Sequence, residues 1–185
     1  MRAIYPENDM LVTFAGVEDL ADGSFVNDLD LRMTIGELST DDEDDPIVRE
    51  GEVTAVTSVE PVTLFSAGHG LANGDRVVVH SVGGVGRSRG THTVANRTDD
   101  TFELSGVNHA GATYEGGGRW HRVVDGADEV PIVFEAGSSG DYAGKLDGTA
   151  SLVVDRPYFA VFYDVGLYAY RLLITAECYA ELNQR

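Results

Sequence analysis

The stretch "SAGHGLANGDRVVVHSVGG", residues 66–84, decides how the rest of the chain is interpreted. Its segment "RVVVHSV" (76–82) predicts a β-strand, because β-branched residues favour extended backbone. Three glycines precede that segment, Gly68, Gly70 and Gly74, and they predict tight turns, since glycine adopts positive φ without steric cost. "NGD" at 73–75 is typical of a turn between two strands. The stretch therefore indicates turn-rich β-structure rather than a ligand-binding loop.

The same pattern continues on both sides of this stretch. Strand-like runs separated by Gly, Asn and Asp recur about every ten residues, in "EVTAVTSVEPVTLFSA" (52–67), "THTVANRT" (91–98), "TFELSG" (101–106) and "ATYEGGGRW" (112–120). None of these windows has the apolar spacing of a helix. About seventy residues of this kind are typical of a small twisted barrel or sandwich.

Charge divides the chain into three blocks. The net charge is −18, of which residues 1–51 carry −11, residues 52–122 carry −1 and residues 123–185 carry −6. The middle block also holds twelve of the 22 glycines and every histidine of the chain: His69, His80, His92, His109 and His121. A composition change at both ends marks a module boundary. We therefore predict a module, residues 52–122, inserted into an acidic host domain formed by residues 1–51 and 123–185.

The acidic host segments also have strand patterns. "DMLVTFAGVEDLADGSFVNDLDLRMTIGEL" (9–38) holds two alternating runs, and "EVPIVFEAG" (129–137), "ASLVV" (150–154), "YFAVFYDV" (158–165) and "YAYRLLITAEC" (168–178) follow the module. Six or seven such strands fit an immunoglobulin-like sandwich. The predicted fold class is all-β, an immunoglobulin-like sandwich with an inserted small β-barrel module.

Composition restricts the compartment and the partners. No run reaches the roughly 18 apolar residues of a membrane span, and no apolar run follows the N-terminal Arg2 as in a signal peptide. We expect the chain to be made in a cytoplasm. The negative charge disfavours nucleic acid and suits either a basic partner or a saline medium. The single Cys178 lies in an apolar run and is expected in the core.

No motif in the sequence predicts chemistry. The histidines have no metal-ligand spacing, and most lie beside expected turns, where we expect them to be solvated. "GGVGRSRG" (83–90) has no following helix to hold a phosphate, so it predicts a hairpin turn with Arg87 and Arg89 at its exposed tip. "DDEDD" (41–45) lacks the spacing of a calcium loop and predicts a solvated acidic loop. We predict no enzyme, no cofactor and no metal.

The aromatic segment "RPYFAVFYDVGLYAYRLL" (156–173) is the second dense feature. A turn at "YDVG" (163–166) would make it a hairpin with aromatic residues on both faces. One face would form the core. The other either contacts a partner or is covered within the chain, and both alternatives stay open. The predicted partner contacts are Tyr158, Phe162, Tyr168 and Tyr170.

Residues 52–122 resemble a small β module of ubiquitin-activating enzymes, the first catalytic-cysteine half-domain, copies of which recur in bacteriophage tail, fibre and other virion proteins. The resemblance is carried by "SAGHGL" (66–71), Gly74 and Asp75, "GTHTV" (90–94) and "TFELSGV" (101–107). It does not imply ubiquitin activation, because the module in those enzymes does not hold the adenylation site and this one has no cysteine. The outer segments are similar, more loosely, to immunoglobulin-like domains of phage structural proteins, through "GDYAG" (140–144) and the strand pair after it.

These resemblances imply a non-enzymatic virion component. The expected place is the head–tail junction (neck) or the tail, with the host domain on an oligomeric ring and the module projecting outward. Portal, connector, tail or capsid subunits are the implied partners, in several copies and without direct contact to nucleic acid or membrane. The implied localisation is the virion, assembled in the host cytoplasm.

Two alternatives to this assignment stay open. One is a capsid decoration protein. The other is a carbohydrate- or receptor-binding module, in which Tyr114, Trp120 and His121 would contact a glycan. If Trp120 instead fills the core of the barrel, which we favour, its removal would cost stability rather than binding.

Overall fold

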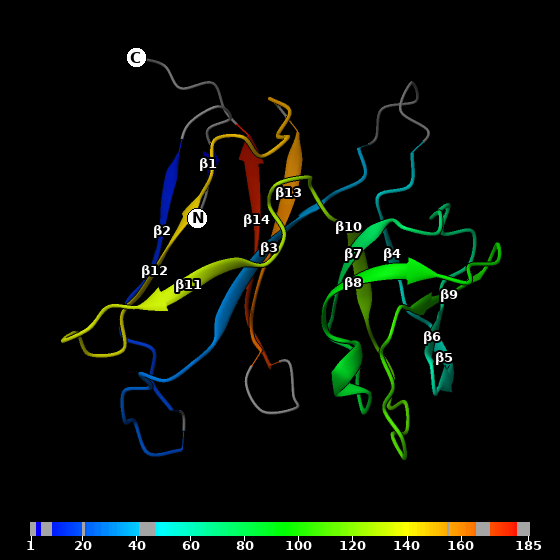
Figure 1. The fold of residues 1–185 in the computed structure, drawn as a ribbon, viewed down its shortest axis with the longest axis horizontal. Coiled ribbons are helices and arrows are strands. Elements are labelled where there is room, and N and C mark those ends of the chain that lie inside the picture. Colours follow the sequence, from blue (N-terminus) through cyan, green and yellow to red (C-terminus); the bar gives the residue numbers. More distant parts are fainter. Residues whose placement is uncertain are drawn as a thin grey trace.

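The computed structural model describes residues 3–4, 9–19, 21–40, 47–154, 156–165 and 171–180, the first and last of these ranges as backbone only. This part of the chain is built of β-strands, and its one helical element is the 3-10 turn Gly86–Ser88 (Figure 1). The predicted all-β class is confirmed. No helix in these ranges is long and apolar enough to cross a membrane.

The first sheet, which we call the sandwich, is made by the two ends of the chain. Its strand order is β1-β14-β13-β3-β11-β12-β2. The strands are β1 (Ala3–Ile4), β2 (Met10–Phe14), β3 (Leu31–Glu37), β11 (Val130–Phe134), β12 (Tyr142–Leu146), β13 (Pro157–Asp164) and β14 (Arg171–Ala180). All neighbours are antiparallel except β1, which pairs in parallel with β14.

Strand β11 folds this sheet into two layers. Residues 130–132 pair with β3, whereas residues 133–134 pair with β12. As a result β2 faces β13, and the ring of Phe14 meets the ring of Phe162 edge-on, with centroids 4.5 Å apart. The backbone N–H of Val153 donates to the hydroxyl of Tyr158 over 2.8 Å, a tyrosine corner typical of immunoglobulin-like sandwiches. The predicted all-β sandwich is confirmed on this architecture.

The second sheet, which we call the half-barrel, is curled and has the order β4-β10-β7-β8-β9-β6-β5. Its strands are β4 (Glu50–Glu52), β5 (Ala55–Val59), β6 (Val62–Phe65), β7 (Arg76–His80), β8 (Gly90–Ala95), β9 (Thr101–Leu104) and β10 (Arg119–Arg122). Val53 and Thr54 connect its two outermost strands, and they donate backbone hydrogen bonds to Gly118 and Phe65 over 2.9 and 3.0 Å. β4 and β5 are consecutive in the chain, but they stand at opposite ends of the strand order. The sheet therefore has to curl, so that its two ends come close to each other.

The stretch 66–84 behaves as its residues predict. Gly68, Gly70 and Gly74 have φ of +61°, +62° and +95°, and β7 follows them directly. The division into a discontinuous host domain and an inserted module remains a prediction, and β4 of the half-barrel begins at Glu50, before the predicted boundary at residue 52.

Two expectations about this region are wrong. Four of the five histidines are buried rather than solvated, with exposed fractions of 7% or less: His69, His80, His92 and His121. Arg89 does not extend from an exposed tip, because its guanidinium donates two hydrogen bonds to the carbonyl oxygen of Val82, over 3.0 and 2.8 Å. Arg87 is exposed as expected. The acidic segment 41–45 and the side chain of Cys178 lie outside the described residues.

Candidate functional site at the junction of the two sheets

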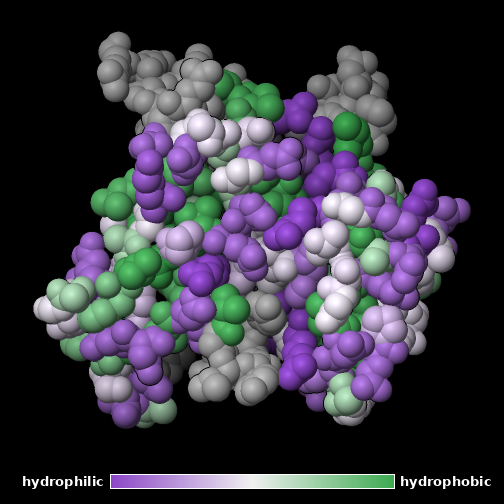
Figure 2. Space-filling model, in the orientation of Figure 1, coloured by the Kyte–Doolittle hydropathy of each residue, from purple (hydrophilic) through white to green (hydrophobic). Residues whose placement is uncertain are grey.

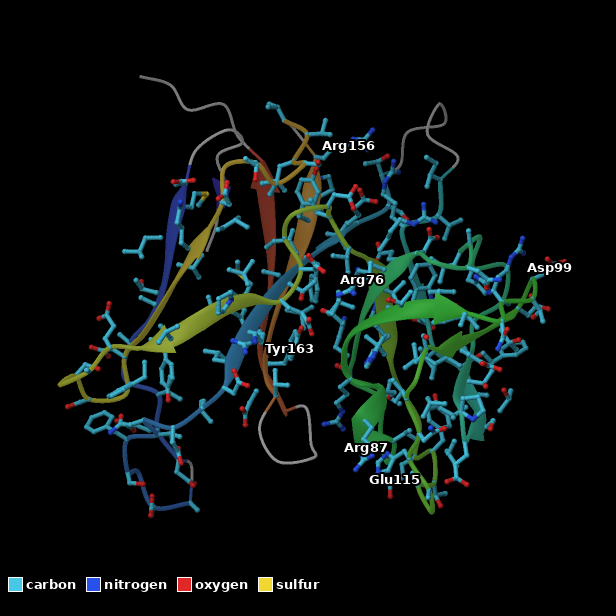
Figure 3. The ribbon with its side chains drawn as sticks, in the orientation of Figure 1. Arg76, Arg87, Asp99, Glu115, Arg156 and Tyr163 are labelled. Carbon is cyan, nitrogen blue, oxygen red and sulfur yellow. The ribbon has the colours of Figure 1, made fainter. Side chains whose placement is uncertain are left out.

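The strongest concentration of buried polar groups lies where the sandwich meets the half-barrel. Strand β13 sends Phe162 into the sandwich core, while Val161 and Tyr163 form a separate core cluster with Val78 of β7 and Val123, which follows β10. All four residues of that cluster are at most 9% exposed. Tyr163 lies where the two sheets face each other (Figure 3). The half-barrel therefore covers the face of β13 that carries Val161 and Tyr163.

Three buried hydroxyl groups bridge the two sheets. Thr34 of β3 and Thr91 of β8 lie 2.6 Å apart through their Oγ1 atoms, and the Tyr163 hydroxyl lies 3.2 Å and 2.8 Å from them. The backbone N–H of Glu129 donates to Thr34 Oγ1 over 3.1 Å. Each hydroxyl can donate once and accept twice, so the three satisfy one another away from water.

The second polar feature of the junction is a pair of histidines, both on strands of the half-barrel. His80 of β7 and His121 of β10 approach through their Nε2 atoms at 3.0 Å, with ring planes only 4° apart. Both rings stack on Phe159 of the sandwich, with centroid distances of 5.3 and 4.7 Å. A hydrogen bond between two Nε2 atoms needs one donor and one acceptor, so at least one imidazole must be neutral.

Burial keeps both imidazoles neutral. Loss of hydration, together with the charge of Arg119, lowers the pKa of His80 to about 4. Burial also lowers the pKa of His121 to about 3, with added repulsion from His80 and then Arg119. At neutral pH the pair is therefore an uncharged link beneath Phe159.

The pair extends into a longer chain of polar contacts. His121 Nδ1 lies 3.5 Å from Glu50 Oε2, and His80 Nδ1 lies 3.0 Å from the hydroxyl of Ser81, an exposed residue with φ +58°. Glutamate, histidine and serine in contact are the components of a nucleophilic site. A base with a pKa of about 4 takes up a proton weakly at neutral pH, so His80 is poorly suited to activate Ser81.

Ion pairs and one glycine complete the junction. Arg76 of β7 lies 2.9 Å from Asp128, which precedes β11, and Arg49 Nε lies 3.2 Å from Glu37 of β3. Burial raises the pKa of Glu37, against the opposing charge of Arg49. At Gly36 an added Cβ would lie 2.5 Å from His121 Cβ, so the close approach of the sheets requires glycine there.

The predicted partner contacts on β13 need correction. Tyr158 and Phe162 are each only 2% exposed and belong to the sandwich core, because the second layer of the sandwich covers them. They offer no surface to a partner in this fold. Tyr168 and Tyr170 lie outside the described residues.

The three predicted glycan contacts are not brought together at a surface. Trp120 is fully buried in the core of the half-barrel, where its Nε1–H donates to Ser66 Oγ over 2.9 Å, and the preference for a core role is confirmed. His121 is 1% exposed in the junction. Tyr114 alone borders a groove, and its hydroxyl donates to the carbonyls of Val53 and Gly117, both over 2.9 Å.

Sequence reasoning missed the junction. Its only local signal is that His80 and His121 lie on strands next to hydrophobic residues, in "VVVH" and "RWH". Within the described part of the chain, no group of three or more His, Cys, Asp or Glu side chains is arranged to hold a metal ion. No protein-family model, curated protein or solved structure matches this chain.

Proposed function

We propose that this protein is a non-enzymatic structural component of a bacteriophage virion, at the head–tail junction (neck) or in the tail. The sandwich docks on an oligomeric ring of portal, connector, tail or capsid subunits by burying surface, in several symmetric copies. The half-barrel projects outward. The proposal rests on the resemblance of residues 52–122 to modules of virion proteins, and on the way that the two sheets are joined.

The observation that carries the proposal is the bonded junction. Contacts between domains of one chain usually permit relative motion unless the interface is large and apolar. Here the apolar cluster around Tyr163 is reinforced by its hydrogen bonds to Thr34 and Thr91 and by the stack of Phe159 on the histidine pair. Such a junction holds the half-barrel in one orientation, as an arm on a ring requires.

Cryo-electron microscopy of intact particles from the system that encodes this chain tests the proposal. We expect symmetric density for both sheets at the neck or tail, with the sandwich against the ring and the half-barrel outward. Symmetric density spread over the capsid would instead identify a decoration protein. Particles that lack the chain would contradict the proposal.

A carbohydrate-binding role is the second candidate, and one groove favours it. This groove, about 510 Å³ in volume, lies beside β4 and β10 and is bordered by Tyr114, Glu52, Thr54, Arg119 and residues 116–118. An aromatic ring with nearby carboxylate, guanidinium and backbone groups is the chemistry that sugar binding uses. A glycan array with the wild type and with Arg119→Ala, which removes an exposed side chain, distinguishes this role. Loss of a specific signal in the variant would support sugar binding.

A further inference from the structure

Strand β2 ends the sandwich sheet without the features that usually protect an edge. In the described part of the chain, its residues 11–14 pair with β12 and with no other strand. Edge strands are generally protected by charged residues, prolines, bulges or covering segments, because their backbone can pair with another chain. The sequence of β2, "MLVTF" (10–14), contains no charge, no proline and no glycine. Its pairing with β12 runs over five residues without a bulge.

The outer face beside this edge carries exposed apolar side chains next to Lys145, the residue that pairs with Leu11. Leu11 is 73% exposed and Val133 of β11 is 64% exposed. Between them lie Thr13 and Ala143, since Val133 pairs with Ala143 and Ala143 pairs with Thr13. Hydrophobic side chains gather over β2, β12 and β11 in the left part of Figure 2. We call Leu11, Thr13, Val133 and Ala143 the edge face.

The other face of β2 packs against the sandwich core. Val12 is buried there, and Phe14 is partly buried against the core. A strand added beside β2 would therefore cover apolar side chains on both faces while its backbone pairs with residues 11–14. This requires an incoming strand with apolar residues at its centre.

The surroundings of the edge face are acidic. Asp9 precedes β2, and Asp141, Asp147 and Glu135 lie at the ends of β12 and β11. Among the described residues, Lys145 pairs with two of these carboxylates, at 2.6 Å from Asp9 and 3.9 Å from Asp147. A second copy of this chain would bring the same carboxylates and a net charge of −18 to the contact. Charge complementarity selects a basic partner instead.

We propose that β2 and the edge face bind a β-strand of a basic partner subunit, which extends the sandwich sheet by strand addition. This inference rests on the proposed function, because the partner is a neighbouring virion protein. The strand is apolar at its centre and carries arginine or lysine near its ends, opposite the carboxylates around β2.

The purified full chain tests this with a short synthetic peptide that has valines at its centre and arginines at both ends. Its control is the same peptide with alternate backbone nitrogens methylated, which keeps the charge but removes the donors. The variant Leu11→Lys is compared with Val153→Lys, which makes the same charge change at an exposed apolar residue outside β2 and the edge face. Binding is measured by calorimetry at about 0.15 M salt, where long-range attraction between charges is screened.

We expect the unmethylated peptide to bind the wild type and the Val153 variant alike, and to bind Leu11→Lys about tenfold more weakly, since the leucine side chain is no longer buried. Equal binding of the methylated peptide, or no effect of Leu11→Lys, would overturn the inference, because attraction would then be purely electrostatic. Self-association of the wild type that Leu11→Lys abolishes would also overturn it, in favour of a second copy. A cryo-electron microscopy map of the particle distinguishes the two proposals. If the chain is present but its β2 strand faces solvent, this inference alone is refuted. If the chain is absent, the proposed function is refuted.

Discussion

The histidine pair predicts that acid destabilises the fold before the carboxylates titrate. Each histidine has a folded pKa below its ordinary value of 6.5, at about 4 for His80 and about 3 for His121. Between pH 6.5 and 4 the unfolded chain therefore binds protons that the folded chain does not. The free energy of unfolding is highest above pH 6.5 and falls as the pH decreases through this window. At about pH 5 each histidine removes about 2 kcal/mol, so the pair removes about 4 kcal/mol.

Urea unfolding at about pH 7 and about pH 5, at fixed salt, measures this loss. Circular dichroism follows the whole chain, and the single tryptophan, Trp120, reports on the half-barrel core by fluorescence. In a double variant, His80→Gln with His121→Gln, the amide groups retain hydrogen bonding but do not titrate, so we expect the pair's share of the pH dependence to disappear. The share of His92 remains, because burial also lowers the pKa of His92 to about 4. Glu37, whose pKa is raised by burial, acts in the opposite direction and reduces the effect. Equal stability of the wild type at both pH values, or an unchanged pH dependence in the double variant, would refute the reasoning.

Four further predictions concern the cores, the junction and the charge. Trp120→Ala should lower the free energy of unfolding by about 3–5 kcal/mol, because the ring is fully buried, and a stable variant in urea titration would contradict this. Tyr163→Phe removes the hydroxyl shared by two threonines and should cost about 1–2 kcal/mol; calorimetry that shows an unchanged melting temperature would count against the hydroxyl cluster. Gly36→Ala should lower the free energy of unfolding by about 1–3 kcal/mol, because its methyl group would lie 2.5 Å from His121 Cβ. Equal stability of the variant in urea would contradict this, since the two sheets could then move apart without cost. Raising sodium chloride from about 0.1 M to 1 M should increase the melting temperature, because it screens a net charge of −18; a flat profile would mean that repulsion costs little.

Local pattern predicted the strands well because their alternation and their turns are properties of neighbouring residues. The segments "RVVVH", "THTVA" and "TFEL" became β7, β8 and β9, and the glycines at 68, 70 and 74 have the positive φ expected of turn positions. The aromatic hairpin was also predicted, since Pro157–Asp164 pairs antiparallel with Arg171–Ala180, although Tyr163 and Asp164 lie in β13 and not in the turn predicted at 163–166. In each case the deciding interactions lie within a few residues of chain.

The junction could not be predicted, because its contacts join residues far apart in sequence. Thr34 and Tyr163 are 129 residues apart, and His80 and His121 are 41 residues apart. A histidine at the end of a strand has the same local pattern whether water or another sheet covers it. For the same reason Tyr158 and Phe162 were expected at a surface, although the layer containing β2 covers them. Burial by a distant segment leaves no trace in a short window of sequence.

The two sheets differ in how their edges end, and this difference bears on assembly. In the half-barrel the two outermost strands, β4 and β5, are consecutive in the chain and are joined through Val53 and Thr54, which bond to both sides of the opening. The sandwich instead ends at β2, an apolar strand paired on one side within the described residues. A sheet whose edges are joined has little backbone to offer a neighbour, whereas an open edge can pair with one. Under the proposed function, the open edge of the sandwich would bind the neighbouring subunit, and the bonded junction would then set the direction in which the half-barrel points.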